Sequence, residues 1–145
     1  MNDESVIKKI LKIEKCIKRK FDKLADSTGI NGTEGRVIHF LILNQDRDIF
    51  QKDVEIEFDF RPSTASELLK KMESKGYILR EVSKTDARLK KLTLTDKAKE
   101  HEERIINDVV SLEEYIQKGI SPKDLETYDR ISNIILENIK NFRNE

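Results

Sequence analysis

The stretch RPSTASELLKKMESKGYILREVSKTDARLKKLTLT, residues 61–95, decides the fold of this chain. Pro62 suits the first turn of a helix and Gly76 follows its end, so we predict a helix over Pro62–Lys75. After Gly76 the hydrophobic period changes from helical to alternating. Residues 77–83 and 90–94 are therefore predicted to form two strands, joined by a polar tip over residues 84–89.

The helix predicted over Pro62–Lys75 has an apolar face and a polar face. Its apolar positions are Ala65, Leu68, Leu69 and Met72, and its polar positions are Ser63, Ser66, Glu67, Lys70 and Ser74. A helix divided in this way packs one side on a core and presents the other to solvent or to a partner.

Three helices are predicted upstream of this stretch. The first covers about Glu4–Thr28, with apolar residues every three or four positions, and Gly29 stops it. Thr33 is the predicted N-cap of a second helix that runs through Asn44. Asp48, with Gln51 three residues later, is a variant of the capping box and starts a short third helix ending near Glu57.

Two helices are predicted downstream. Thr95 is the predicted N-cap of a helix over about Asp96–Lys118, and Ser121-Pro122 begins the last helix. The order of elements in the middle of the chain is that of a winged helix-turn-helix. The first and last helices carry more apolar surface than so small a unit can cover, which predicts burial against a second copy of the chain.

Length and composition agree with this fold. The 145 residues suit a single domain, with residues 30–100 as the winged lobe and residues 1–29 and 101–145 as dimerisation helices. Charged residues make up 39% of the chain and its net charge is zero. The charge is unevenly spread, because residues 61–99 hold 11 Lys/Arg against 5 Asp/Glu, whereas residues 100–145 hold 6 against 11. A basic middle can give a neutral protein a positive face.

Four stretches occur in this order along the chain: Phe50–Asp53, Arg61–Ser66, Leu69–Ile78 and Asp86–Thr95. The third holds the Lys75-Gly76 turn, and the fourth holds the wing motif Asp86-Ala87-Arg88 and the exit Leu92-Thr93-Leu94-Thr95. Together they resemble the MarR family of bacterial transcriptional regulators over about residues 30–100. The resemblance implies a dimer joined by the first and last helices, a recognition helix in the major groove and a wing in the minor groove of DNA. It also implies release of DNA when a small aromatic or phenolic ligand, or an oxidant, acts on the protein.

The polar edge of the helix over residues 62–75 is the predicted reader of DNA. Ser63, Thr64 and Ser66 are short donors and acceptors near the helix N-terminus, and Lys70 and Lys71 add positive charge. Glu67 lies on the same face and is included in the predicted interface. Taken alone, such an edge favours a helix that merely faces water. The hairpin behind it favours DNA reading.

Arg88, at the predicted hairpin tip, is the residue we expect to enter a narrow minor groove, where the potential is negative. Asp86 is predicted to brace it or to bond the turn backbone. The alternative is that Arg88 is a solvated surface charge. The candidate phosphate contacts are Gln51, Lys52, Arg80, Lys84 and Lys90.

An effector pocket is the second predicted site. Phe21, Arg36 and His39 are its candidate walls, with Arg36 available for a ligand carboxylate. The alternative for His39 is a packed, hydrogen-bonded histidine. Cys16 is either a small residue beside the apolar stripe or, with Lys15, Lys18 and Arg19 nearby, a redox-active thiol. Peroxide-sensing members of the resembled family carry their cysteine near the start of the first helix, whereas Cys16 lies in its middle.

Other function classes find little support in the sequence. Two His and one Cys give no zinc-ligand spacing, and no phosphate-binding or dinucleotide-binding glycine pattern occurs. We therefore expect no enzyme, no metal and no cofactor. No apolar run reaches the length of a membrane span, and we expect a cytoplasmic protein. The expected partners are a pseudo-palindromic DNA duplex, a second copy of the chain and a small aromatic or phenolic effector. A winged module that binds proteins instead of DNA is the alternative function.

Overall fold

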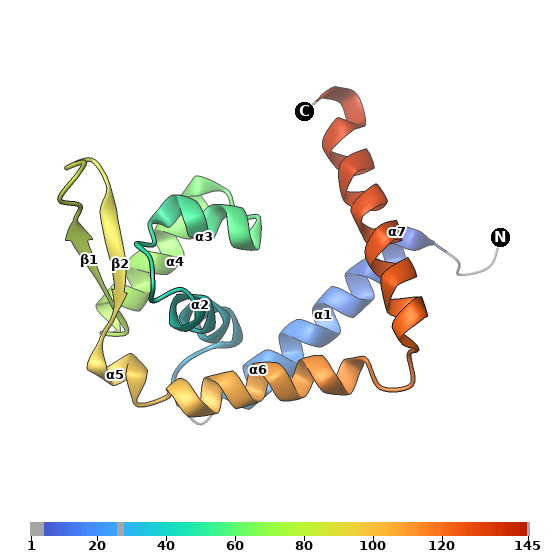
Figure 1. Ribbon diagram of the computed structural model, residues 1–145, viewed down its shortest axis with the longest axis horizontal. Coiled ribbons are helices and arrows are strands. Elements are labelled where there is room, and N and C mark those ends of the chain that lie inside the picture. The colour runs from blue at the N-terminus through green and yellow to red at the C-terminus, as the bar shows by residue number, and fades with distance from the viewer. Residues whose placement is uncertain (1–4, 26–27, 145) are drawn as a thin grey trace. The chain divides into compact units, whose positions relative to one another are not determined.

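The computed structural model describes residues 5–25 and 28–144, which are mostly helical and carry one β-hairpin (Figure 1). The elements are α1 (Val6–Ala25), α2 (Gly32–Leu43), α3 (Gln51–Phe58), α4 (Pro62–Ser74), β1 (Ile78–Val82), β2 (Lys90–Leu94), α5 (Asp96–Lys99), α6 (Glu102–Ile116), α7 (Pro122–Asn141) and a short 3₁₀ turn, η1 (Phe142–Asn144). This confirms the predicted class, mainly α with a small hairpin.

The chain divides into two compact units, Met1–Ser111 and Leu112–Glu145, and the division falls inside α6. The first unit holds the hydrophobic core. Val37, Ile38, Leu69, Met72 and Ile78 are all fully buried there. They come from α2, α4 and β1, so the predicted recognition helix is fixed by the core on its apolar side.

The two strands pair antiparallel, with Ile78 opposite Leu94 and Val82 opposite Lys90. A third piece of extended chain joins them, since Phe50 forms a bridge with Lys91. The Leu92 amide also donates to the Ile49 carbonyl over 2.7 Å. The hairpin is therefore attached to the segment that leads into α3, and Figure 1 shows it beside α4.

The helix ends differ from the predicted ones in three places. The N-cap of α2 is Asn31 and not Thr33, because the Asn31 side chain accepts the Glu34 amide while Glu34 accepts the Asn31 amide, a complete capping box. The helix α3 begins after Phe50 and not at Asp48, since Asp53 accepts the Phe50 amide over 2.8 Å. Thr28 lies in a turn beyond α1. The predicted start of α1 at Glu4 falls outside the described residues.

The single helix predicted over Asp96–Lys118 is two helices. Thr95 caps α5 as expected, accepting the Ala98 amide over 3.2 Å. The chain then turns at Glu100 and His101 before α6 begins. The start of α7 is as predicted, with Ser121 accepting the Asp124 amide and Pro122 in the first turn.

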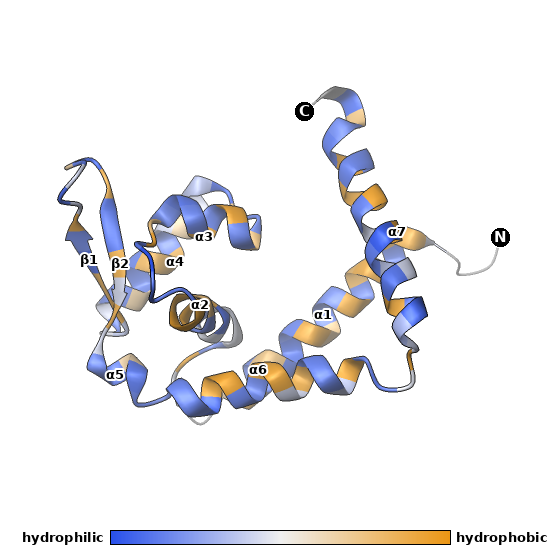
Figure 2. Cartoon of the chain, viewed as in Figure 1, coloured by the Kyte–Doolittle hydropathy of each residue, from blue (hydrophilic) through white to orange (hydrophobic). Residues whose placement is uncertain are grey.

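Large apolar side chains remain exposed along α1 and α7. Figure 2 shows that hydrophobic residues recur along both helices. On α1 they include Val6, Ile7 and Leu11, and on α7 no described residue is buried. Among the described residues no helix combines the length and apolarity that a membrane span needs.

Candidate nucleic-acid interface and effector pocket

The N-terminal edge of α4 is open to solvent. Pro62 occupies the first turn, and Ser63 and Thr64 are exposed, whereas Ser66 is half-buried. Ala65, one residue before Ser66, is fully buried, so the core fixes which side of the helix faces outward. Further along, the side chains of Glu67, Lys70 and Lys71 are exposed as well. The outward side of α4 is thus an array of hydroxyl groups followed by charges.

The start of α3 is joined to the start of α4 through Gln51. Its Nε2 atom donates to the Pro62 carbonyl over 3.3 Å and to Glu55 Oε2 over 3.2 Å. Lys52 is exposed and lies 3.7 Å from Glu55 Oε1. Gln51 therefore holds the two helices together, and Lys52 extends from the same region into solvent.

Arg88 projects from the tip of the wing, with 89% of its side chain exposed. Asp86 holds it in place, because one carboxylate oxygen accepts the Arg88 amide and Nε (3.0 and 3.1 Å) and the other accepts Nη2 (3.0 Å). The hydrogen bonds from Arg88 lower the pKa of Asp86, and the carboxylate raises the pKa of Arg88. The guanidinium is thus oriented before any partner arrives, although it remains in water.

Lys84 and Lys90 are exposed at the two ends of the wing loop. Arg80 has a different environment from these two lysines. Its guanidinium donates to Glu73 Oε1 over 3.0 Å, and only 19% of its side chain is exposed. That hydrogen bond also lowers the pKa of Glu73. Arg80 therefore attaches β1 to α4, and a phosphate contact from it stays a prediction.

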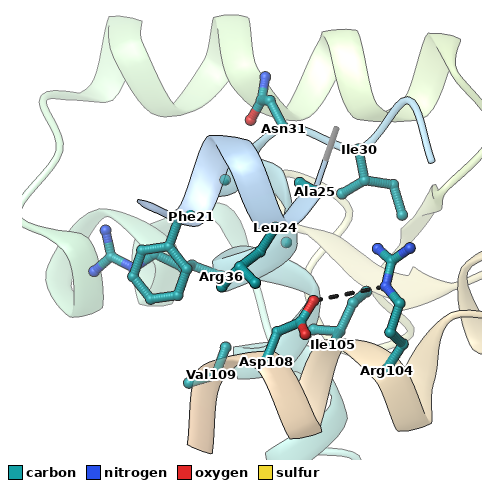
Figure 3. A pocket seen from close by; sticks show the side chains of 12 residues that line it. Phe21, Leu24, Ala25, Ile30, Asn31, Arg36, Arg104, Ile105, Asp108 and Val109 are labelled. Carbon is teal, nitrogen blue, oxygen red and sulfur yellow. Dashed lines mark ion pairs between the residues drawn. The ribbon is translucent and has the colours of Figure 1, made fainter. Parts of the chain in front are cut away.

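A hollow of about 290 Å³, counted to its open mouth, lies in the first unit (Figure 3). It is lined by Phe21, Leu24, Ala25, Ile30, Asn31, Gly32, Gly35, Arg36, Arg104, Ile105, Asp108 and Val109. Two of the three predicted effector residues, Phe21 and Arg36, belong to this lining. His39 does not, and burial lowers its pKa.

Arg36 lies between two aromatic rings. Its guanidinium carbon is 5.6 Å from the centre of the Phe21 ring and 5.2 Å from the centre of the Phe58 ring. Figure 3 shows Arg36 and Phe21 on one side of the hollow and Arg104 on the other, where it pairs with Asp108 over 3.6 Å. The hollow therefore presents one cation packed on aromatic rings and one paired with a carboxylate.

Cys16 is exposed on α1. In the described part of the chain, no group of three or more His, Cys, Asp or Glu side chains is arranged to hold a metal ion.

Sequence reasoning missed a polar cluster at the end of α4. Lys75 pairs with the buried Glu34 over 2.9 Å, and the Tyr77 hydroxyl donates to the Thr28 carbonyl over 3.5 Å. Asn31 with Glu34 three residues later is a capping-box signature, so the sequence held a signal for the position of Glu34. Nothing in the sequence signals its pairing with Lys75, 41 residues away.

The order α2, α3, α4 and hairpin, with α3 and α4 joined at their starts and a wing behind them, defines a winged-helix protein. A model of the MarR family matches residues 28–89. The transcription regulator MarR from Oenococcus oeni PSU-1 has 31% sequence identity, a TM-score of 0.82 and coverage of 90% of this chain and 98% of that one. The chain therefore belongs to the MarR family of winged-helix transcription regulators.

Two further solved structures are similar in fold. The S. aureus MepR–DNA complex has a TM-score of 0.88 and 21% identity, covering 96% of this chain and 99% of that one. The heme sensor protein PefR from Streptococcus agalactiae, in complex with heme, has a TM-score of 0.62 and 26% identity, covering 95% and 96%. No curated protein sequence matches the chain.

Proposed function

We propose that this protein is a sequence-specific regulator that binds double-stranded DNA as a homodimer, with α4 in the major groove and the wing in the minor groove. The observation that carries this proposal is the wing tip. The Arg88 side chain is 89% exposed, yet its guanidinium is oriented by two hydrogen bonds to Asp86, and a third comes from the Arg88 backbone amide. A pre-oriented guanidinium suits the negative potential of a narrow minor groove.

The outward side of α4 supports the same proposal. Ser63 and Thr64 stand at a helix N-terminus, where backbone amides and hydroxyls suit phosphates and base edges. Lys70 and Lys71 add charge that attracts the duplex without reading its sequence. The S. aureus MepR structure, which is similar over nearly the whole chain, was solved with DNA.

The exposed apolar side chains of α1 and α7 support the homodimer. Val6 and Ile7 are 58% and 69% exposed, and Ile139 is 60% exposed. Apolar stripes of this length rarely stay in water on a folded protein. Two-fold symmetry then predicts a pseudo-palindromic operator with half-sites about 10 base pairs apart.

A ligand-responsive repressor is the form of regulation we infer. The hollow beside Phe21 and Arg36 supports it, because an aromatic ring can pack on Phe21 while its carboxylate or phenolate meets Arg36. The similar PefR structure was solved with heme, so a chain of this fold does bind a ligand. We also propose that the protein is cytoplasmic, in the compartment of the DNA it would bind, and that it is not an enzyme.

Two alternatives have less support. A winged module that binds proteins would need aromatic anchors on α4, and its outward side carries Ser, Thr, Lys and Glu. A redox regulator would act through Cys16, which is exposed, and oxidant-insensitive DNA binding would remove that role.

The test is selection of bound sequences from a random duplex library, with the full-length protein at near-physiological salt. We expect enrichment of a palindrome with half-sites about one helical turn apart. A folded dimer that enriches nothing, and that binds no duplex at low salt, would contradict DNA reading and redirect the search to protein partners.

A further inference from the structure

Glu34 is a carboxylate with no exposed surface, at the N-terminus of α2. Its Oε1 atom accepts the amide of Asn31 over 2.9 Å and completes the capping box. In the described residues its other oxygen, Oε2, has no hydrogen-bond partner. A buried carboxylate is costly to desolvate, so its cationic partner matters for the structure around it.

That partner is Lys75, the C-cap of α4. Lys75 Nζ donates to the same oxygen, Glu34 Oε1, over 2.9 Å, and also lies 3.4 Å from the Gly29 carbonyl. One oxygen atom thus joins the first turn of α2 to the last residue of the predicted recognition helix. The Lys75 side chain is 33% exposed, so the cation bridges a buried site and the surface.

The backbone around Lys75 is held as well. Lys97 Nζ donates to the Lys75 carbonyl over 2.8 Å, and the Thr95 hydroxyl donates to the Gly76 carbonyl over 2.6 Å. Gly76 has a φ of +81°, which suits a glycine at this turn. The end of α4 is therefore fixed from the side of α2 by an ion pair and from the side of α5 by hydrogen bonds.

The other end of α4 carries Ser63 and Thr64, the proposed readers of DNA. Thirteen residues give a helix roughly 20 Å long, so a tilt of about 3° at the Lys75 end moves the Ser63 end by roughly 1 Å. A displacement of that size is enough to spoil a hydrogen bond to a base edge, since hydrogen bonds have narrow distance limits.

We propose that Glu34 and Lys75 are positioning residues for DNA recognition, which set the direction of α4 without touching the duplex. This inference rests on the proposed function. It differs from a phosphate contact by Lys75, which would weaken the binding of every duplex equally and lower the salt dependence. It also differs from a general loss of stability, which reduces the amount of active protein and leaves sequence discrimination unchanged.

The opposite charges of the two residues make the test sharp. Removing a cation from a DNA-binding lobe weakens binding to any duplex, and removing an anion strengthens it. Positioning predicts instead that Glu34→Gln and Lys75→Met change discrimination in the same direction. The matched controls are Glu100→Gln and Lys99→Met, which change the same charges on exposed side chains in and beside α5.

The experiment measures the affinity of each full-length variant for the duplex that the wild type selects and for a shuffled duplex of equal length, over a series of salt concentrations. We expect the ratio of the two affinities to fall by roughly tenfold in Glu34→Gln and in Lys75→Met, the size of one lost base contact. The double variant should lose no more than either single one, Lys75→Arg should recover most of the ratio, and the controls should keep it. If Lys75→Met does not fold, Lys75→Gln takes its place.

An unchanged ratio in both single variants overturns the positioning role, whatever their thermal stability. So does a Lys75→Met variant that weakens both duplexes equally, with a smaller salt slope, while Glu34→Gln binds more tightly, because that pattern belongs to a phosphate contact. A third outcome is a wild-type protein that binds the selected duplex and its shuffled counterpart equally well. It overturns the proposed function and, with it, the role of the pair.

Discussion

The winged lobe, residues 30–100, differs from the helices α1 and α7 in how far its apolar residues are exposed. In the lobe Val37, Ile38 and Leu69 have no exposed surface. On α7 Ile131 and Ile139 are 44% and 60% exposed, although the helical spacing of their apolar neighbours is as regular as in the lobe. Periodicity therefore identifies a face to be buried, but it does not say whether the same chain or a second copy covers it.

The largest expected effect comes from placing charges on the exposed apolar face of α7. Ile131→Glu combined with Ile139→Glu alters four side chains in a two-fold dimer. Full burial of one such side chain contributes about 1.5–3 kcal/mol, and Ile131 and Ile139 are 44% and 60% exposed, so the association should lose roughly 3–6 kcal/mol and the dimer should dissociate. Sedimentation or light scattering at micromolar protein measures the change.

The matched control adds the same charges to the polar side of α7, as Asn133→Glu with Asn141→Glu, at two exposed residues with polar side chains. This variant should remain dimeric. A wild-type protein that is monomeric, or an Ile131/Ile139 variant that stays dimeric, would contradict the assignment of this face to a second copy.

The next largest effect comes from a cavity in the buried core of the lobe. Leu69→Ala removes a side chain with no exposed surface from the apolar face of α4, and the cavity should lower the free energy of unfolding by about 2–5 kcal/mol. Urea unfolding of the full-length protein at fixed concentration measures it. Ile56→Ala, at a side chain on α3 that is 71% exposed, should change the free energy by less than about 0.5 kcal/mol.

The elements of the lobe were predictable from the sequence because local signals agree there. The proline of α4, the glycine after it and the alternating strands are short-range features, and Thr95 caps the start of the helix it was expected to cap, as Ser121 does outside the lobe. The errors arose where two local signals compete. Asn31 and Thr33 are both good N-caps, and only Asn31 has a glutamate three residues later to complete the box.

Contacts between distant residues were not predictable. The helix predicted over Asp96–Lys118 joined Ala98 to Ile105 across six residues without an apolar side chain, and the turn at Glu100 and His101 that separates α5 from α6 lies in that gap. The pairing of Arg80 with Glu73 occupies a cation that was expected to face phosphates. For the candidate site, the exposed residues of α4 and the wing came from sequence, whereas the ion pair at Lys75 required the fold.

A smaller effect is expected at the surface of the lobe, from Arg88 at the tip of the wing. Arg88→Ala should weaken operator binding by about 1–3 kcal/mol, a loss on the scale of one good groove contact, with the fold intact. A titration at fixed salt measures it. Arg88→Lys keeps the charge but loses the two-oxygen contact with Asp86, so it should fall between the wild type and Arg88→Ala. Unchanged affinity in Arg88→Ala would remove the proposed groove contact.

The smallest expected effect is a change in the pH dependence of stability, through the half-buried side chain of His39. Burial lowers the pKa of His39 below its ordinary value of 6.5, so the folded protein binds a proton at this side chain less readily than the unfolded chain. The contribution of His39 to stability is thus fully present above pH 6.5 and is lost as the pH falls from 6.5 through the folded-state pKa. Urea midpoints measured near neutral pH and near pH 5.5 should therefore differ less in His39→Gln than in the wild type. An equal difference in the two proteins would mean that His39 titrates alike in the folded and unfolded states, as a solvated surface histidine does.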